Sequence, residues 1–193
     1  MNLLSPTLEG KRVTLLPLHE SHIPGLIAAA NDPAIWSYMN PLAQPTDVQK
    51  FVQQALEEQQ AGQGIPFSVY DRVSDTIVGS TRLFDISAAH RHLEIGHTWY
   101  NPTVWRSRVN TECKYLLLHY CFETLGLLRV QLKTDGRNER SQAAIARLGA
   151  QKEGVLRKHR VLHDGYVRDT VMFSILDQEW PQVKQRLEGF LSN

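Results

Sequence analysis

The sequence predicts a mixed α/β domain in which a mostly antiparallel, twisted sheet is flanked by helices. Three observations lead to this prediction. Short runs of β-branched and aromatic residues alternate with segments of helical period. The three runs in the middle of the chain follow one another through polar turns, which predicts an antiparallel meander. The dipeptide Asp164-Gly165 stands between two later runs and is a strong hairpin signal.

The first half of the chain predicts one strand, two helices and three strands. Pro33 ends the first helix, because the residue before a proline disfavours helical geometry. Thr46 and Asp47 are candidate N-caps of the second helix. The expected ranges are a strand at 12–16, helices at 23–30 and 46–61, and strands at 67–70, 77–84 and 93–99.

The second half completes the order βαα-βββ-αβα-ββ-α. Gly126 and Gly149 stand where helix C-caps favour a residue of positive φ. The expected ranges are a helix at 111–125, a strand at 130–134, a helix at 141–148, strands at 155–162 and 167–175, and a helix at 177–191. The long helix should bury Cys113, Leu116, Leu117, Tyr120, Cys121 and Thr124, and the last helix should dock through Trp180, Val183, Leu187 and Leu191.

Composition narrows the class of protein. The 193 residues suit one domain, residues 1–193, and are enough to bury a core without disulfides or metals. The 21 basic and 20 acidic residues argue against a nucleic-acid binder, which usually has a pronounced basic excess. The segment MNLLSPTLEGKR lacks the features of a secretion signal, and no run is long enough to span a membrane. Cys113 and Cys121 are expected to be buried free thiols. We therefore expect a cytoplasmic protein with no metal and no membrane partner.

A basic turn precedes the helix expected at 111–125. It reads Trp105, Arg106, Ser107, Arg108, Val109, Asn110 and Thr111. The first backbone N–H groups of a helix have no intrahelical partner, and its dipole favours an anion. With two arginines beside it, this turn predicts a site for a diphosphate.

Nearly the whole chain, and above all the stretch from Glu94 to Gly149, resembles the GCN5-related N-acetyltransferases (GNAT superfamily), most closely the ribosomal-protein N-terminal acetyltransferases of the RimJ/RimL type. The resemblance is carried by Glu94-Ile95-Gly96, by the turn before the helix, and by Asn138 and Ser141 ahead of Leu148-Gly149-Ala150. It implies the GNAT fold, acetyl-CoA as co-substrate, and an amine acceptor, either a protein N-terminus or a small molecule.

One departure from the family pattern concerns the turn. Arg108 and Asn110 stand where the family usually has small residues that let the backbone approach phosphate closely. Asn tolerates the left-handed region better than most residues. The Arg108 guanidinium can instead offer phosphate a planar set of side-chain donors.

Two residues are candidate bases for the acceptor amine. Glu94 lies on the strand that in this family runs beside the thioester, with Leu93 and Ile95 on the opposite face. Its competing interpretation is an exposed glutamate paired with Arg91 or a neighbouring strand. His97 is the second candidate. Its placement with Leu93, Ile95 and Trp99 also fits a packed core histidine.

The resemblance assigns further roles. Ser141 would hydrogen-bond the departing thiolate. The place of the family's tyrosine holds Ile145, so Ser141 or solvent would have to assist the thiolate. Asn138 would hold the pantetheine arm, Arg140 would reach the phosphates, and backbone amides near Trp99 would polarise the carbonyl. A helix cap is the alternative for Ser141 and Asn138, and a solvated loop for Arg140.

The acceptor side is expected between the two early helices and the late hairpin. Trp36 and Tyr38 would form one wall and Tyr166 the other, although a buried aromatic staple explains the first pair equally well. The favoured function is direct acetyl transfer from acetyl-CoA to an amine, by a monomer or homodimer. The alternatives are a non-catalytic acyl-CoA-binding module and a protein-interaction module of the same fold.

Overall fold

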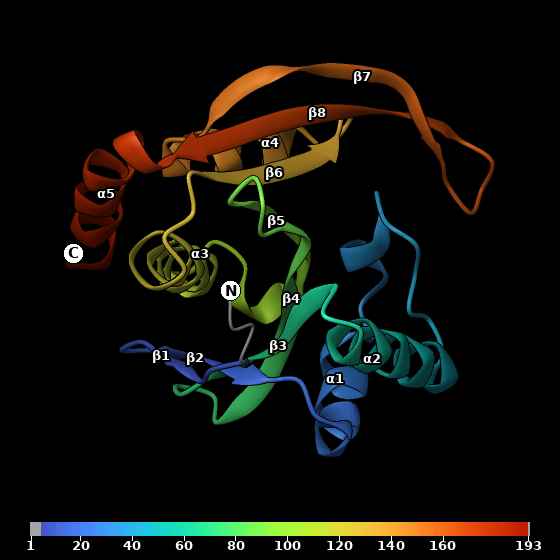
Figure 1. Ribbon diagram of the computed structural model, residues 1–193. Helices are drawn as coiled ribbons and strands as arrows, with labels where there is room; N and C mark the ends of the chain where they lie inside the picture. Colours follow the sequence, from blue (N-terminus) through green and yellow to red (C-terminus); the bar gives the residue numbers. More distant parts are fainter. Residues whose placement is uncertain (1–4, 193) are drawn as a thin grey trace.

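The computed structural model describes residues 5–192 and contains an eight-stranded sheet with helices on both faces (Figure 1). The strand order is β1-β2-β3-β4-β5-β6-β8-β7, and every neighbouring pair is antiparallel except β5–β6. The elements are β1 Leu8–Glu9, β2 Val13–Pro17, α1 Ile23–Ala29, α2 Pro45–Gln60, β3 Gly64–Asp71, β4 Thr76–Ser87, β5 His92–Tyr100, α3 Val109–His119, β6 Arg129–Asp135, α4 Glu139–Leu148, β7 Gln151–Val161, β8 Val167–Leu176 and α5 Trp180–Ser192.

The predicted fold class and element order are confirmed, with the short strand β1 as an addition. The central meander β3–β4–β5 is antiparallel, as the sequence predicts. Strand β7 begins four residues earlier than expected, at Gln151. The hairpin signal at Asp164-Gly165 is also confirmed, since Gly165 has a φ of 82° between β7 and β8.

Two helix details differ from the sequence prediction. Helix α2 has Gln44, not Thr46 or Asp47, as its N-cap; Asp47 instead accepts a hydrogen bond from the Gln44 amide, 2.9 Å long. The helix expected at 111–125 is α-helical only to His119 and ends in a π-helical turn over Tyr120–Thr124. A π-helical turn widens the helix and changes the direction of the side chains. Thr124 is accordingly exposed.

Two apolar clusters cover the two faces of the sheet. On one face α3 and α5 pack together, and Figure 1 shows α1 and α2 on the other. Cys113, Leu117 and Cys121 of the α3 segment are fully buried, and both cysteines are free thiols, as predicted. The docking stripe of α5 is confirmed by the buried side chains of Trp180, Val183 and Leu187.

A β-bulge in β5 corrects the predicted facing of its side chains. Ser80 pairs with Trp99 and Arg82 pairs with Gly96, so β5 has one residue more than β4 over this interval. The extra residue changes the alternation of the strand. Leu93 and Ile95 therefore belong to the α3 cluster, whereas Trp99 packs with α1 and α2. The expectation of one shared face for Leu93, Ile95, His97 and Trp99 is wrong beyond the bulge.

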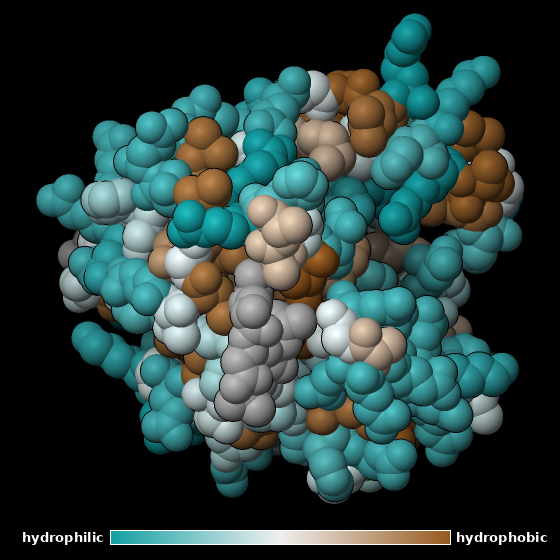
Figure 2. All heavy atoms as spheres, viewed as in Figure 1, coloured by the Kyte–Doolittle hydropathy of each residue, from teal (hydrophilic) through white to brown (hydrophobic). Residues whose placement is uncertain are grey.

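Most of the exposed large apolar side chains in the described residues belong to the β7–β8 hairpin. They are Val155, Leu156, Val161, Tyr166 and Val167. Figure 2 shows a brown surface at the right, where the hairpin lies in Figure 1. Within residues 5–192, no helix is both long and apolar enough to cross a bilayer.

Candidate active site

The site begins where the two parallel strands β5 and β6 separate. Their ladder has three pairs, the last of which joins Glu94 to Gln131. Strand β5 continues to Tyr100 and β6 to Asp135, and no backbone hydrogen bond joins these continuations in the described structure. Two diverging strand edges therefore present N–H and C=O groups that a third extended chain can pair with.

The basic turn lies at the far end of β5, before the N-terminus of α3. Arg106 has the left-handed φ of 58°, whereas Arg108 is the N-cap with φ −75° and Asn110 lies inside the helix. The positive φ therefore falls at Arg106, and neither Arg108 nor Asn110 takes a left-handed conformation. The Ser107 Oγ lies 3.3 Å from the Val109 amide nitrogen and accepts its hydrogen bond. Arg106 and Arg108 are both exposed.

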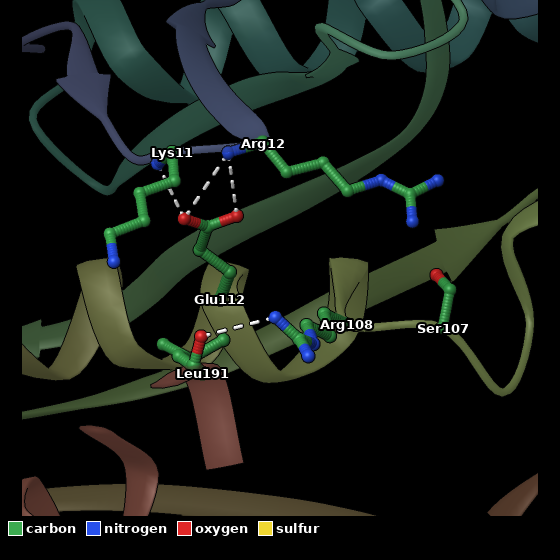
Figure 3. Close-up of a pocket in the computed structure, with 6 residues that line it drawn as sticks. All are labelled: Lys11, Arg12, Ser107, Arg108, Glu112 and Leu191. Atoms are coloured by element: carbon green, nitrogen blue, oxygen red, sulfur yellow. Dashed lines mark hydrogen bonds between the residues drawn. The ribbon is translucent and has the colours of Figure 1, made fainter. Parts of the chain in front are cut away.

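A hollow of about 360 Å³ opens beside this helix N-terminus (Figure 3). Lys11, Arg12, Ser107, Arg108, Glu112 and Leu191 line it. Glu112 is buried, and its carboxylate accepts hydrogen bonds from the amides of Lys11, Arg12 and Val13, so it joins α3 to the start of β2. Arg108 donates to the Leu191 carbonyl at 3.2 Å. Glu112 is thus fully engaged, and the Arg12 guanidinium is paired with Asp71 at 2.8 Å. Among the described residues that line the hollow, Lys11 and Arg108 are the cations without a carboxylate partner.

Glu94 is buried on β5 at the point where the strands separate. Its carboxylate is 2% exposed and accepts a 2.7 Å hydrogen bond from Lys133 Nζ on β6. Glu94 is therefore not exposed, and it is not paired with Arg91, whose side chain donates to the Gly126 carbonyl. The alternative of a partner on a neighbouring strand is confirmed by Lys133 on β6. Burial raises the pKa of Glu94, and Lys133 opposes that rise. A raised pKa makes this carboxylate a stronger base.

His97 lies in the bulge with a φ of 48°. The residue is exposed, and its imidazole packs edge-on against the Phe84 ring at a centroid distance of 4.8 Å. The interpretation of His97 as a packed core histidine is therefore wrong. Desolvation of the imidazole, aided by the charge of Arg82, lowers the pKa of His97 to about 4. The imidazole is therefore neutral at pH 7 and a weaker base than an ordinary histidine.

The start of α4 approaches the same region from β6. Asn138 is the N-cap, and its Oδ1 accepts the Ser141 amide at 3.0 Å. The capping interpretation of Asn138 is thus confirmed, and its side-chain N–H₂ group is not needed for the cap. Ile145, at the position of the family's tyrosine, is buried and has no hydroxyl group.

Two arginines of α4 connect this helix to the basic turn. The guanidinium carbon of Arg140 lies 3.9 Å from the ring centroid of Trp105. About two helical turns further on, Arg147 donates a 2.7 Å hydrogen bond to Thr111 Oγ1 at the start of α3. The basic turn after β5 and helix α4 after β6 are therefore in contact with each other.

Tyr38, Arg137 and Tyr166 meet at the other end of the site. The guanidinium carbon of Arg137 is 3.5 Å from the Tyr166 ring centroid and 5.5 Å from that of Tyr38. The Asp135 carboxylate accepts hydrogen bonds of 2.8 and 3.1 Å from the Arg137 guanidinium. The structure thus brings together Tyr38 and Tyr166, the two residues that the sequence placed on opposite acceptor walls.

Comparison with known proteins decides the family. A family model described as an acetyltransferase (GNAT) domain matches residues 12–151. The chain belongs to the GNAT family of acetyltransferases. It is 27% identical to the uncharacterized N-acetyltransferase p20 of Bacillus licheniformis over 176 aligned residues. The alignment covers 90% of this chain and 98% of that protein.

Solved structures agree with this assignment. A GCN5-related N-acetyltransferase from Brucella melitensis superposes with a TM-score of 0.89 at 31% identity, covering 97% of this chain and 86% of the other. Mycobacterium smegmatis RimJ, solved in complex with CoA-disulfide, gives a TM-score of 0.75 at 22% identity over 92% and 88% of the chains. This GNAT chain is an acetyltransferase enzyme, and the solved structures that share its fold include a RimJ protein.

Two of the predicted residues contribute mainly to the core of this GNAT domain. Trp36 is 8% exposed and donates to the Ala30 carbonyl at 3.1 Å, and its ring lies 5.4 Å from that of Trp99. Trp99 is 3% exposed, so its side chain offers little surface to a cofactor. The binding roles of both residues stay predictions.

The sequence analysis missed Lys133, Arg147 and Lys114. Each contacts a residue at least 16 positions away, namely Glu94, Thr111 and Thr98. No local pattern indicates such pairs. The described residues hold no group of three or more His, Cys, Asp or Glu side chains that is arranged to bind a metal ion.

Proposed function

We propose that this GNAT enzyme transfers the acetyl group of acetyl-CoA directly to a primary amine, with the acyl-pantetheine arm along the separated edges of β5 and β6. The observation that carries the proposal is the end of the β5–β6 ladder at Glu94 and Gln131, with the basic N-terminus of α3 beyond it. An amide-containing arm can pair with such edges, and a diphosphate suits the helix terminus. The CoA-disulfide bound to Mycobacterium smegmatis RimJ is consistent with this choice of donor.

Glu94 is the proposed general base, acting through a water molecule. Its carboxylate is only 2% exposed, so a bridging water can reach it more readily than an acceptor side chain. A lysine-type amine has a pKa of ~10.4 and an α-amine one of about 7.7–8.0. Both acceptor types must lose a proton to attack, and the raised pKa of Glu94 helps it take that proton. His97, with its low pKa, is a weaker candidate.

Acetyl-CoA would supply the thioester. The amine nitrogen forms a bond to the acetyl carbon, the carbon–sulfur bond breaks, and the proton leaves through Glu94. Backbone N–H groups near Trp99 would polarise the carbonyl, and the Ser141 hydroxyl would donate to the departing thiolate. A free thiol has a pKa of ~8.5, so this leaving group needs little assistance. The lack of a hydroxyl at Ile145 is therefore compatible with turnover.

For the acceptor we propose the end of the site formed by Tyr38, Arg137 and Tyr166. A second hollow of about 350 Å³ adjoins it, and Arg137 and Tyr166 contribute to its lining. The aromatic rings and the guanidinium offer flat surfaces to an N-terminal peptide or to a small amine. Both classes of acceptor are proposed, and the protein is proposed to act in the cytoplasm.

The first experiment is calorimetric titration with acetyl-CoA and CoA, followed by thiol release with a panel of N-terminal peptides and small amines. Binding with amine-dependent release supports the proposal. Binding without release from any acceptor favours a non-catalytic acyl-CoA-binding module. If neither compound binds, the protein-interaction alternative is favoured.

Variants then test the base. Glu94→Gln should lower kcat by about a hundredfold with little change in the Kd of acetyl-CoA. Lys133→Met should instead keep much of the activity and move the acidic limb of the pH profile upward, because the ion pair no longer opposes the raised pKa of Glu94. Glu57→Gln, on the exposed side of α2, is the control. Equal losses in the Glu94 and Lys133 variants would remove Glu94 from the role of base.

A further inference from the structure

Lys114 is a buried lysine on α3 that the proposed chemistry does not use. The residue is 6% exposed, and its Nζ donates a 2.9 Å hydrogen bond to Thr98 Oγ1. Among the described residues Lys114 forms no ion pair with a carboxylate. An ammonium group has three donors and loses much hydration when it is buried. A hydroxyl compensates little of that loss, so stability does not explain this lysine.

The partner of Lys114 belongs to the β5 bulge. Thr98 follows His97, and its Oγ1 also lies 2.8 Å from Thr81 Oγ1 on β4 and 3.4 Å from the Gly96 carbonyl. The single hydroxyl of Thr98 thus connects α3, β4 and the bulged backbone. The bulge forms part of the β5 edge that separates from β6. Lys114 therefore reaches the candidate acyl site from the α3 side of the sheet.

Among the described residues, Cys113 is the titrating group whose charge acts on the pKa of Lys114. Burial raises the pKa of Cys113, the adjacent thiol on α3, to about 12, and it raises the pKa of Tyr100 on β5 well above its ordinary value. Glu112 on α3 is held by the three backbone amides of residues 11–13. Thr98 and Thr81 do not titrate. Burial lowers the pKa of Lys114 itself to about 8.

We propose that Lys114 is a positioning residue for acetyl transfer, which fixes the β5 bulge through Thr98 and places a positive charge beneath the atoms that become negative during amine attack. This inference rests on the proposed function, because it requires the thioester to lie along β5. A buried charge acts strongly on a developing oxyanion, since little water screens it. The same burial makes the lysine costly to the folded protein, which is typical of a functional group.

The test compares Lys114→Met with wild type in thiol release, acetyl-CoA binding and urea unfolding. Methionine keeps an unbranched side chain and removes the charge. We expect kcat to fall at least roughly tenfold, the Kd of acetyl-CoA to stay nearly constant, and the variant to be more stable than wild type at pH 7. The wild-type kcat should also decline as pH rises through about 8, and this decline should be absent in the variant.

Three further variants isolate the contact. Thr98→Val keeps the ammonium and removes its hydrogen-bond partner, so kcat should fall, and Thr98→Ser should restore most of it. Lys50→Met, at an exposed position of α2, should behave as wild type.

The outcomes separate this inference from the proposed function. Wild-type turnover with an unchanged kcat in Lys114→Met overturns the role of Lys114 alone. Loss of activity together with loss of stability in Lys114→Met would show a structural role and would also overturn it. Absence of turnover by the wild type with every amine overturns the proposed function and, with it, this inference.

Discussion

Lys114→Met should make the protein more stable at neutral pH, which is unusual for a substitution at a buried polar position. Lys114 is 6% exposed, and its pKa falls from the ordinary 10.5 to about 8 because burial disfavours the charged form. The fall from 10.5 to about 8 corresponds to roughly 3 kcal/mol, since one pKa unit is about 1.36 kcal/mol. Removing the ammonium removes this cost.

The pH dependence of this effect has a definite sign. Below pH 8 the lysine is protonated in both the folded and the unfolded state, so the wild type bears the full cost of the buried charge. Between pH 8 and 10.5 the folded protein loses the proton while the unfolded chain keeps it, so wild-type stability rises with pH. The advantage of Lys114→Met should therefore be largest at pH 7 and disappear near pH 10.5.

Urea unfolding followed by tryptophan fluorescence at pH 7, 8.5 and 10 measures this difference. All other titrating groups are shared by the two proteins, so subtracting the two free energies of unfolding removes their contributions. A variant that is less stable at pH 7, or a stability difference that does not change with pH, would refute the argument that Lys114 is a charge buried at a cost.

Two predictions concern the walls of the site. Gly96→Ala should destabilise the protein by about 1–3 kcal/mol and reduce activity, because a Cβ at Gly96 would lie 2.7 Å from a carbon of the Phe84 ring. Thermal unfolding measures the loss of stability. The control is Gly154→Ala, which should be neutral because nothing lies within 4 Å of its added Cβ. Arg140→Ala should weaken acetyl-CoA binding roughly tenfold by calorimetry, since the guanidinium stacked on Trp105 is exposed beside the basic turn and free to reach a phosphate. An unchanged Kd would show that Arg140 only covers the tryptophan.

The sequence alone determined the order of the elements and the location of the basic turn. Alternation of apolar residues, helical periods, Gly149 and Asp164-Gly165 act over a few residues, and each led to the element that the structure shows. Glu94 could also be placed opposite Leu93 and Ile95, because strand alternation holds up to the bulge.

The tertiary structure decided what this order means for the site. The bulge at His97 is a property of the pairing between β4 and β5. The opening between β5 and β6 depends on a ladder that ends after three pairs. The bond between Lys133 and Glu94, and the burial of Lys114 beneath Thr98, likewise depend on how strands and helices pack. These contacts join residues far apart in the chain, whereas periodicity and turn signals report only the local conformation of a few neighbouring residues.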